Sequence, residues 1–350
     1  MRLRVSHSLR NALLTVFAAL LLGACGNGAN EPALVEITGP TMGTYYSVKI
    51  ADPPGQVQTT TVREIIESAL DNVSRGMSTY DKTSELSRFN ASRETGWIPA
   101  STELLTVLRE ALHISALSDG AFDVTVAPMV DLWGFGPVDT GDRVPTEEEI
   151  RAAAASTGYT RLSIRSTPPA LRKDHPDTRI DLSSIAKGYA VDVLAEQLEA
   201  LGISNYLVEI GGELRGKGHN RRGEQWRIGI ETPSTGKRMV YTVVAIDDIA
   251  VATSGDYRNY FEQDGRRYSH TIDPVTGRPI THKLASVTVV GRSTMQADAM
   301  ATALMVLGPD KGYALAEREG LAACFIIRGA HGFTDRQTTA FSRHRAERRG

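Results

Sequence analysis

The sequence predicts an α+β protein built as one large mixed domain. Segments with apolar residues at helical spacing occur together with short runs that are rich in β-branched residues. The 350 residues are 41% hydrophobic and 23% charged, a composition typical of a globular protein with a sizeable core. The sequence shows no fixed-period repeat and no internal linker rich in Pro, Gly or Ser. A single domain is therefore the simplest expectation, although this length could hold two.

The first 24 residues are expected to form a signal peptide. Arg2, Arg4 and Arg10 precede an apolar run over residues 12–22. A membrane-spanning helix needs about 20 apolar residues, and this run is roughly half that length. The run is followed by Leu-Gly-Ala-Cys at 22–25, which resembles the bacterial lipobox, in which the cysteine is acylated and becomes the first mature residue.

Cys25 is therefore predicted to carry lipid, and residues 25–36 to tether it to the folded domain. An ordinary signal peptide with an incidental cysteine is the alternative. A lipid anchor would hold the protein in the cell envelope, facing the periplasm. Residues 26 and 27 lack the Asp that usually follows the lipidated Cys of lipoproteins kept in the inner membrane. This slightly favours the outer membrane, but the choice of membrane stays open.

The mature chain is mildly acidic. Loss of the signal peptide removes three Arg and no acidic residue, so the whole-chain net charge of −2 becomes −5. No basic face indicates nucleic acid as a partner. The one cationic cluster is at the end of the chain, so residues 336–350 are expected to be a basic, disordered tail behind a folded domain at 37–335. If Cys25 carries lipid, only Cys324 remains and no intramolecular disulfide is possible. The apolar neighbours of Cys324 predict a structural role.

The helices and strands are placed by their patterns. Helical spacing predicts four helices, at about 62–73, 104–112, 184–201 and 295–307. Gly202 is a natural stop for the third of them, and Thr146 with Glu149 has the pattern of a capping box. Runs of β-branched residues predict strands at 206–210, 227–231, 240–246, 285–290 and 323–327.

Asp298 and Thr302 are four residues apart on the fourth predicted helix. A carboxylate and a hydroxyl therefore lie on one helix face, about one turn apart. Both are hard oxygen ligands, and one carboxylate suits Mg²⁺, which completes its octahedron with waters and substrate phosphates. The alternative is a solvent-facing polar edge of an amphipathic helix, and spacing alone favours that alternative.

A second cluster, at 181–188, surrounds the start of the third predicted helix. Asp181 and Lys187 flank this start. Backbone N–H groups and the helix dipole favour an anion there, and Lys187 could contact a phosphate. Alternatively, Ser183 or Ser184 is simply the N-cap.

Two further clusters lie at 120–125 and 269–274. In the second of them, His270 and Asp273 are suited to a base and a carboxylate that orients it or balances its charge, although a lone His beside a turn is more often structural. Gly-Gly-Glu at 211–213 lacks any phosphate-loop fingerprint and is interpreted as a turn.

Taken together, these clusters resemble the FAD:protein FMN transferase family, also called ApbE-type flavin transferases. The resemblance extends over most of the mature chain, and each motif is weak alone. Their occurrence in the family's order behind a lipobox makes the assignment specific. It also outweighs the alternative that Asp298 and Thr302 form a solvent-facing polar edge of the fourth predicted helix. The motifs are Thr-Met-Gly-Thr at 41–44, Met-Ser-Thr-Tyr at 77–80, Leu-Ser-Arg-Phe-Asn at 86–90, Phe-Asp at 122–123, the 181–188 cluster, Glu-Ile-Gly-Gly at 209–212, Thr-Ser-Gly-Asp-Tyr at 253–257, the 270–274 segment and Ala-Asp-Ala-Met-Ala-Thr at 297–302.

The resemblance implies a catalytic domain of the flavin-transferase (ApbE, T-fold-like) type over 37–335. It implies that Asp298, the Thr302 hydroxyl and the backbone carbonyl of Ser184 bind Mg²⁺, and that FAD lies across the metal. Many relatives have Gly or Ala at 183 and 184, which matters little if the ligand is a carbonyl. His270 matches the proposed base, and Asp273 could steady the site. Contacts with the flavin nucleotide are implied at Met42, Tyr80, Ala121, Phe122, Asp123, Asp181, Lys187 and Ile272.

The implied reaction is a phosphoryl transfer. A Thr or Ser hydroxyl of a partner protein attacks the phosphorus on the riboflavin side of FAD, FMN becomes attached through a phosphoester, and AMP departs. Such partners include flavin-carrying subunits of Na⁺-pumping quinone reductase or related electron-transport complexes. Two alternatives stay open: an FAD pyrophosphatase that uses water as the acceptor, and a non-enzymatic FAD-binding lipoprotein, against which His270 argues.

Overall fold

The computed structural model describes residues 34–345 apart from 138–140, 142, 234–238 and 257–258. The predicted signal peptide, Cys25 and the tether up to residue 33 therefore lie outside the described residues, as do Tyr257 and the last five residues. Within the part that is described, no helix is long and apolar enough to cross a membrane.

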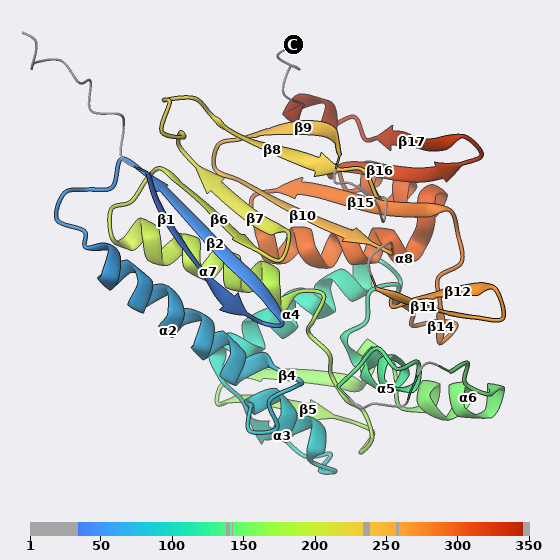
Figure 1. The fold of residues 1–350 in the computed structure, drawn as a ribbon. Coiled ribbons are helices and arrows are strands. Elements are labelled where there is room, and N and C mark those ends of the chain that lie inside the picture. The colour runs from blue at the N-terminus through green and yellow to red at the C-terminus, as the bar shows by residue number, and fades with distance from the viewer. Residues whose placement is uncertain (1–33, 138–140, 142, 234–238, 257–258, 346–350) are drawn as a thin grey trace, which may run out of the picture. The chain divides into compact units, whose positions relative to one another are not determined.

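An eight-stranded antiparallel sheet forms the centre of the fold (Figure 1). The predicted strands at 206–210, 285–290 and 323–327 are confirmed within it. In spatial order its strands are β1 (Leu34–Thr41), β2 (Thr44–Ala51), β6 (Tyr206–Ile210), β7 (Glu213–Lys217), β10 (Ile249–Gly255), β15 (Leu284–Gly291), β16 (Ala322–Gly329) and β17 (Gly332–Gln337). Because β1 begins at Leu34, residues 34–36 of the expected tether belong to the sheet.

The central strands of this sheet are buried on both faces, and their apolar side chains alternate between two cores. On β16, Ala323 and Phe325 belong to the larger core, whereas Ala322, Cys324 and Ile326 belong to a second core. A strand that is buried on both faces carries a continuous apolar run, which is the pattern that predicted this strand. Cys324 is a buried free thiol, as its apolar surroundings predicted.

Helices α7 (Ala186–Ala200) and α8 (Thr294–Arg318) pack on the sheet, α7 against β6 and β7 and α8 against β10 and β15. Helix α2 (Thr59–Met77) packs on α7, and α4 (Thr102–Leu117) packs on α8 (Figure 1). All four predicted helices are confirmed. Helix α8 is longer than expected, but its regular part breaks at Gly308, whose φ of 79° is left-handed, just after the predicted end at residue 307.

A hairpin of β8 (Trp226–Glu231) and β9 (Val240–Ile246), two further predicted strands, contributes to the second core. Phe341, in a 3₁₀ turn over Phe341–His344, is fully buried in the same core. The expectation of a disordered tail from residue 336 is therefore wrong up to Arg345. The arginines of this segment suggested disorder, but the buried Phe341 side chain anchors it to the second core.

The remaining elements are small and frame the loops of the candidate site. The predicted capping box is present, with the Thr146 and Glu149 side chains each accepting from the other residue's backbone N–H at the start of a helix over Glu147–Ala155. The elements are α3 (Glu85–Ala91), a sheet of β3 (Ile98–Pro99), β5 (Pro169–Lys173) and β4 (Leu162–Ser166), helices α5 (Ala127–Leu132) and α6 (Glu147–Ala155), the hairpins β11 (Tyr260–Gln263) with β12 (Arg266–Ser269) and β13 (Ile272–Asp273) with β14 (Arg278–Pro279), and 3₁₀ turns at Val124–Val126 and Tyr159–Arg161.

Candidate functional site

One ammonium and two carboxylates meet where α7, β7 and α8 begin. Lys187 Nζ lies 3.1 Å from Glu213 Oε1 and 3.7 Å from Asp298 Oδ2. Glu213 is 4% exposed and Asp298 is 5% exposed, so both carboxylates are almost removed from solvent. The structure thus brings together Lys187 and Asp298, which the sequence analysis singled out, and adds Glu213, which it had assigned to a turn.

The charges of this cluster depend on one another. Burial alone lowers the pKa of Lys187, but the charges of Asp298 and Glu213 outweigh it and hold the pKa above its usual range. Burial raises the pKa of Glu213 to about 7, and the nearby charge of Asp298 adds to the rise that Lys187 opposes. Burial likewise raises the pKa of Asp298, against the effects of Lys187 and the Gly188 N–H. A cation placed beside Asp298 would therefore be strongly attracted.

Helix α7 fixes Asp298 in place on α8. The backbone N–H of Gly188 donates to Asp298 Oδ2 at 3.0 Å. Asp192, also on α7, accepts from the backbone N–H groups of Thr294 and Met295 at 2.9 and 3.0 Å and from Ser293 Oγ at 2.8 Å. A carboxylate at a helix N-terminus satisfies free N–H groups and interacts well with the helix dipole. The two helices are thus locked together at the site.

Gly188 is required for the close contact between α7 and α8. A Cβ built on Gly188 would lie 2.4 Å from the carbonyl oxygen of Thr294 and 2.8 Å from the Cα of Met295, and both are backbone atoms that cannot move aside cheaply. Overpacking of this kind typically costs about 1–3 kcal/mol. We expect Gly188→Ala to lower the melting temperature, measured by circular dichroism, and to weaken the hydrogen bond to Asp298.

Gly76→Ala is the matched control for this prediction. Gly76 lies in α2, and a Cβ there would meet no atom within 4 Å. Because Ala is the better helix former, this variant should melt at or slightly above the wild-type temperature. Equal melting curves for the two variants would contradict the role given to Gly188.

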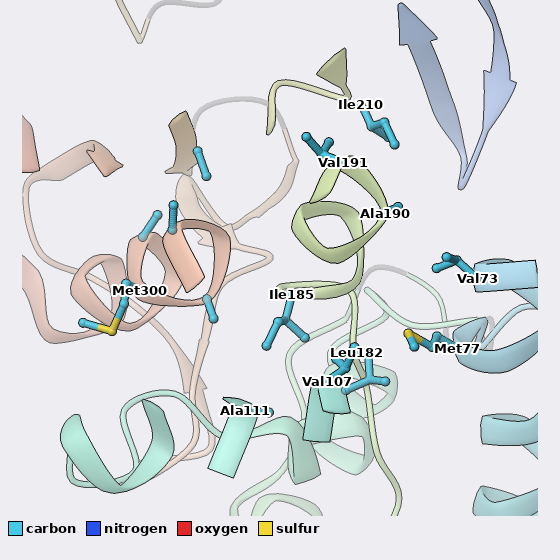
Figure 2. Close-up of a cluster of buried hydrophobic side chains, with 14 of the residues drawn as sticks. Val73, Met77, Val107, Ala111, Leu182, Ile185, Ala190, Val191, Ile210 and Met300 are labelled. Carbon is cyan, nitrogen blue, oxygen red and sulfur yellow. The ribbon is translucent and has the colours of Figure 1, made fainter. Parts of the chain in front are cut away.

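The carbonyl group of Ser184 has no backbone partner among the described residues. In a regular helix it would accept from the N–H of Gly188, but that N–H donates to Asp298 instead. The N-cap of α7 is Ile185, without a side-chain cap, so neither Ser183 nor Ser184 caps this helix. Leu182 and Ile185 hold the turn, because both side chains are buried beside residues of α4 (Figure 2). The carbonyl is therefore both fixed and available.

The donors available here suit Mg²⁺. Both protein contacts of the Asp298 carboxylate fall on Oδ2, and within the described residues the Thr302 hydroxyl makes no hydrogen bond. A carboxylate, a hydroxyl and a carbonyl are hard oxygen donors, and Mg²⁺ usually takes few protein ligands of this kind. No group of three or more His, Cys, Asp or Glu residues that could hold a metal occurs in the described parts of the chain. The arrangement fits Mg²⁺ better than Zn²⁺.

Two hairpin turns meet beside this cluster. Met42 and Gly43 connect β1 to β2 with φ angles of 46° and 71°, and Gly211 and Gly212 connect β6 to β7 with 62° and 111°. Positive φ at both central residues is the geometry that two-residue hairpins require, and it is costly for Met. Gly211 N donates to Tyr45 O at 3.2 Å, which joins the two turns. Met42 thus lies at the same end of the strands as Glu213.

The loop at 120–125 packs against the segment before α7. Asp181 N donates to Val124 O at 2.7 Å. The Asp123 carboxylate accepts from Thr125 N, Thr125 Oγ1 and Tyr159 N at 2.6–2.7 Å, so it is occupied by its own loop and by the 3₁₀ turn that begins at Tyr159. Phe122 is 2% exposed in the large core, as expected of a structural side chain, and Ala121 is 6% exposed. In this structure, Phe122 and Asp123 are engaged within the protein, which leaves mainly the backbone of the loop to contact a ligand.

The charge of Asp181 acts on the Tyr80 hydroxyl. Burial raises the pKa of the Tyr80 hydroxyl, and the charges of Asp181 and Asp131 add to the rise. The Tyr80 side chain is nevertheless 72% exposed, which suits an aromatic surface that a ligand could cover. Asn90, from the Leu-Ser-Arg-Phe-Asn motif, holds the segment before Asp181 by accepting from Ile180 N and donating to Ile180 O, both at 2.8 Å. This motif therefore positions the site without entering it.

His270 has the geometry of a base. Its Nδ1 lies 3.0 Å from the carbonyl oxygen of Asn259. Because a carbonyl oxygen can only accept, Nδ1 carries the proton and Nε2 keeps its lone pair. Burial lowers the pKa of His270, and the Lys187 charge lowers it further, against the opposing effects of the Asn259 hydrogen bond and the Asp256 charge. The effect of Lys187 links His270 electrostatically to the buried cluster.

Asp273 does not orient His270. Its Oδ1 accepts from Val275 N at 2.9 Å and its Oδ2 accepts from Thr276 Oγ1 at 3.0 Å, so the carboxylate closes its own turn. The structure gives the orienting role to the Asn259 carbonyl instead. Ile272 is buried among the aromatic residues of a third small core, beside Phe261 and Trp133.

Known proteins share both this sequence and this fold. The model of the ApbE family matches residues 42–325. A FAD:protein FMN transferase of Vibrio cholerae serotype O1 is 48% identical over 333 residues, which cover 95% of this chain and 98% of that relative. The FAD:protein FMN transferase of Escherichia coli K12 is 43% identical over 307 residues, 87% of each chain.

Two solved structures extend this similarity to the fold. The flavin transferase ApbE from Vibrio cholerae superposes with a TM-score of 0.84 at 46% identity, over 89% of this chain and 99% of that one. The apo form of the Pseudomonas stutzeri flavinyl transferase ApbE superposes with a TM-score of 0.83 at 45% identity, over 91% of this chain and 98% of that one.

Proposed function

The chain belongs to the ApbE family and is a transferase, and from this premise we propose that it is a Mg²⁺-dependent FAD:protein FMN transferase. FAD is its substrate, and a protein hydroxyl is its acceptor. The observation that carries the proposal is the arrangement of His270, whose Nδ1 is committed to a carbonyl and whose Nε2 is free to accept a proton. A protein that only stored FAD would not need a base beside the phosphates.

The proposed reaction transfers the FMN group to a Thr or Ser. His270 Nε2 accepts the proton of that hydroxyl, whose oxygen forms a bond to the phosphorus on the riboflavin side of FAD. The bond from that phosphorus to the bridging oxygen breaks, and AMP leaves with the oxygen. The phosphoester product joins FMN to the acceptor.

The chain's own groups hold the pyrophosphate for this step. The Asp298 carboxylate, the Thr302 hydroxyl and the Ser184 carbonyl would hold Mg²⁺, which when bound offsets negative charge on phosphate oxygens. The Lys187 ammonium supplies a second positive charge, fixed between two buried carboxylates. The exposed ring of Tyr80 and the Met42 turn offer contacts for the nucleotide.

Mass spectrometry of an acceptor protein tests the proposal. We expect an acceptor incubated with this protein, FAD and Mg²⁺ to gain one FMN group on a single Thr or Ser, and to gain none when EDTA is present. A suitable acceptor is a flavin-carrying subunit of Na⁺-pumping quinone reductase or a related electron-transport complex. Free FMN with an unmodified acceptor would identify a pyrophosphatase instead, and intact FAD would identify a binding protein.

We further propose that Cys25 is acylated and anchors the protein in the cell envelope, because the residues before it resemble a lipobox. Cys25→Ser is expected to move the protein from the membrane fraction to the soluble fraction, because two or more acyl chains hold a protein firmly whereas removal of the thiol prevents acylation. Fractionation followed by immunoblotting measures this, with Cys324→Ser as the control that should stay in the membrane fraction. A Cys25→Ser variant that remains with the membrane would contradict lipidation.

A further inference from the structure

Glu213 is buried beside the candidate site, and the proposed reaction assigns it no task. Its side chain is 5% exposed, and Oε2 is buried without a hydrogen-bond partner in the described structure. A buried carboxylate is costly unless it is paired, and a buried unsatisfied oxygen calls for an explanation. Oε1 is paired with Lys187, but no contact within the described structure accounts for Oε2.

The Lys187 ammonium is shared unequally between its two partners. At 3.1 Å its contact with Glu213 is within hydrogen-bond distance, whereas at 3.7 Å its contact with Asp298 is not. Glu213 is rigidly placed, because it is the first residue after the Gly211–Gly212 turn and pairs with Ile210 across the hairpin. The ammonium therefore rests on a fixed carboxylate that is not a candidate metal ligand.

We propose that Glu213 is a positioning residue that holds Lys187 back from Asp298 and so keeps the charge of Asp298 available to Mg²⁺. This inference rests on the proposed function, in which Asp298 is a metal ligand. Without the Glu213 charge, the nearest anion for the buried ammonium is Asp298 itself. A close Lys187–Asp298 pair then competes with the metal ion for one carboxylate.

Glu213→Gln tests this inference without changing side-chain size. Loss of a residue that supports a metal ligand typically costs about 10- to 100-fold in metal affinity. We expect the Mg²⁺ affinity of Glu213→Gln, measured by calorimetry and by Mg²⁺-dependent shifts in melting temperature, to fall by that order. Glu213→Asp, which keeps the charge, should recover most of the affinity. Glu209→Gln, an exposed carboxylate on the neighbouring strand, is the matched control and should bind Mg²⁺ as wild type does.

A double-mutant cycle shows whether Glu213 acts through Lys187. In a Lys187→Met background, no ammonium competes for Asp298, so adding Glu213→Gln should leave the Mg²⁺ affinity unchanged. An equal loss of affinity in both backgrounds would mean that Glu213 acts on the metal directly, and unchanged affinity in the single variant would mean a purely structural role. Either result overturns the inference. Failure of the proposed function is distinguishable, because the wild-type protein would then transfer no FMN to the acceptor, whereas failure of this inference leaves wild-type transfer intact.

Discussion

Asp298→Asn is expected to abolish Mg²⁺-dependent FMN transfer while leaving the protein folded. Asn keeps an oxygen that can accept from the Gly188 N–H but loses the charge that attracts the metal. Lys187 retains Glu213 at 3.1 Å, so the substitution leaves no unpaired buried ammonium. Metal stabilisation of transferring phosphate charge is worth several kcal/mol, which corresponds to a loss of about 10³-fold or more in kcat/KM. Steady-state kinetics over a range of Mg²⁺ concentrations measures the loss.

Asp310→Asn serves as the control for Asp298. Asp310 lies on the same helix, but its side chain is 92% exposed and, among the described residues, pairs with Arg336 at the surface. Its substitution should leave both activity and Mg²⁺ dependence unchanged, since exposed ion pairs contribute little. Wild-type turnover by Asp298→Asn at ordinary Mg²⁺ concentrations would remove Asp298 from the metal site.

His270→Ala is expected to slow transfer by about 10²- to 10⁴-fold, the usual contribution of a positioned general base, with little change in FAD affinity. The rate is followed by mass spectrometry of the acceptor, and the affinity by fluorescence of bound FAD. His331→Ala, at an exposed position on the hairpin between β16 and β17, is the control and should behave as wild type. A parallel collapse of rate and affinity would make His270 a binding or structural residue.

The pH profile provides a separate check on His270. A base must be neutral to accept a proton, so activity falls as the pH drops below its pKa. Burial and the Lys187 charge lower the pKa of His270, so the acid limb of the wild-type profile should lie below the ordinary value of about 6.5. The residual activity of His270→Ala should lack that limb. An acid limb above this value in the wild type would assign it to another group.

The sequence predicted those parts of the fold that have a local signature. The four long helices carry apolar residues at helical spacing, and the Thr146–Glu149 capping box marks a helix start within four residues. The hairpin of β1 and β2 was not predicted, because Gly39 and Pro40 interrupt the pattern of β1. Pro40 is tolerated there because β1 is an edge strand. The position of β1 at the edge is set by the strand order of the whole sheet, which the local sequence does not reveal.

Candidate site residues could be named from the sequence where a motif contains them, and were missed where contact between distant segments creates the role. Asp298, Lys187 and His270 were singled out in this way, whereas Glu213 gains its importance only when the β6–β7 turn meets α7. Asp273 shows the reverse error: its spacing from His270 suggested a pair, but a short side chain in a turn bonds more readily to the backbone two residues on. The local sequence thus indicates which side chains could react. The packing of separate elements decides which group each carboxylate contacts.

The order of strands in the sheet also governs how the chain can assemble. Strand β2 pairs with β6, yet helices α2 to α7 all lie between them in the sequence. The hairpin of β1 and β2 emerges first and lacks its neighbour, and an isolated hairpin is at best marginally stable in water. The sheet therefore closes only after most of the helical layer has been synthesised, with a large loss of chain entropy on closure. Such long-range pairing is typical of slow folders, for which protection of the early strands before the sheet closes matters more than their own stability.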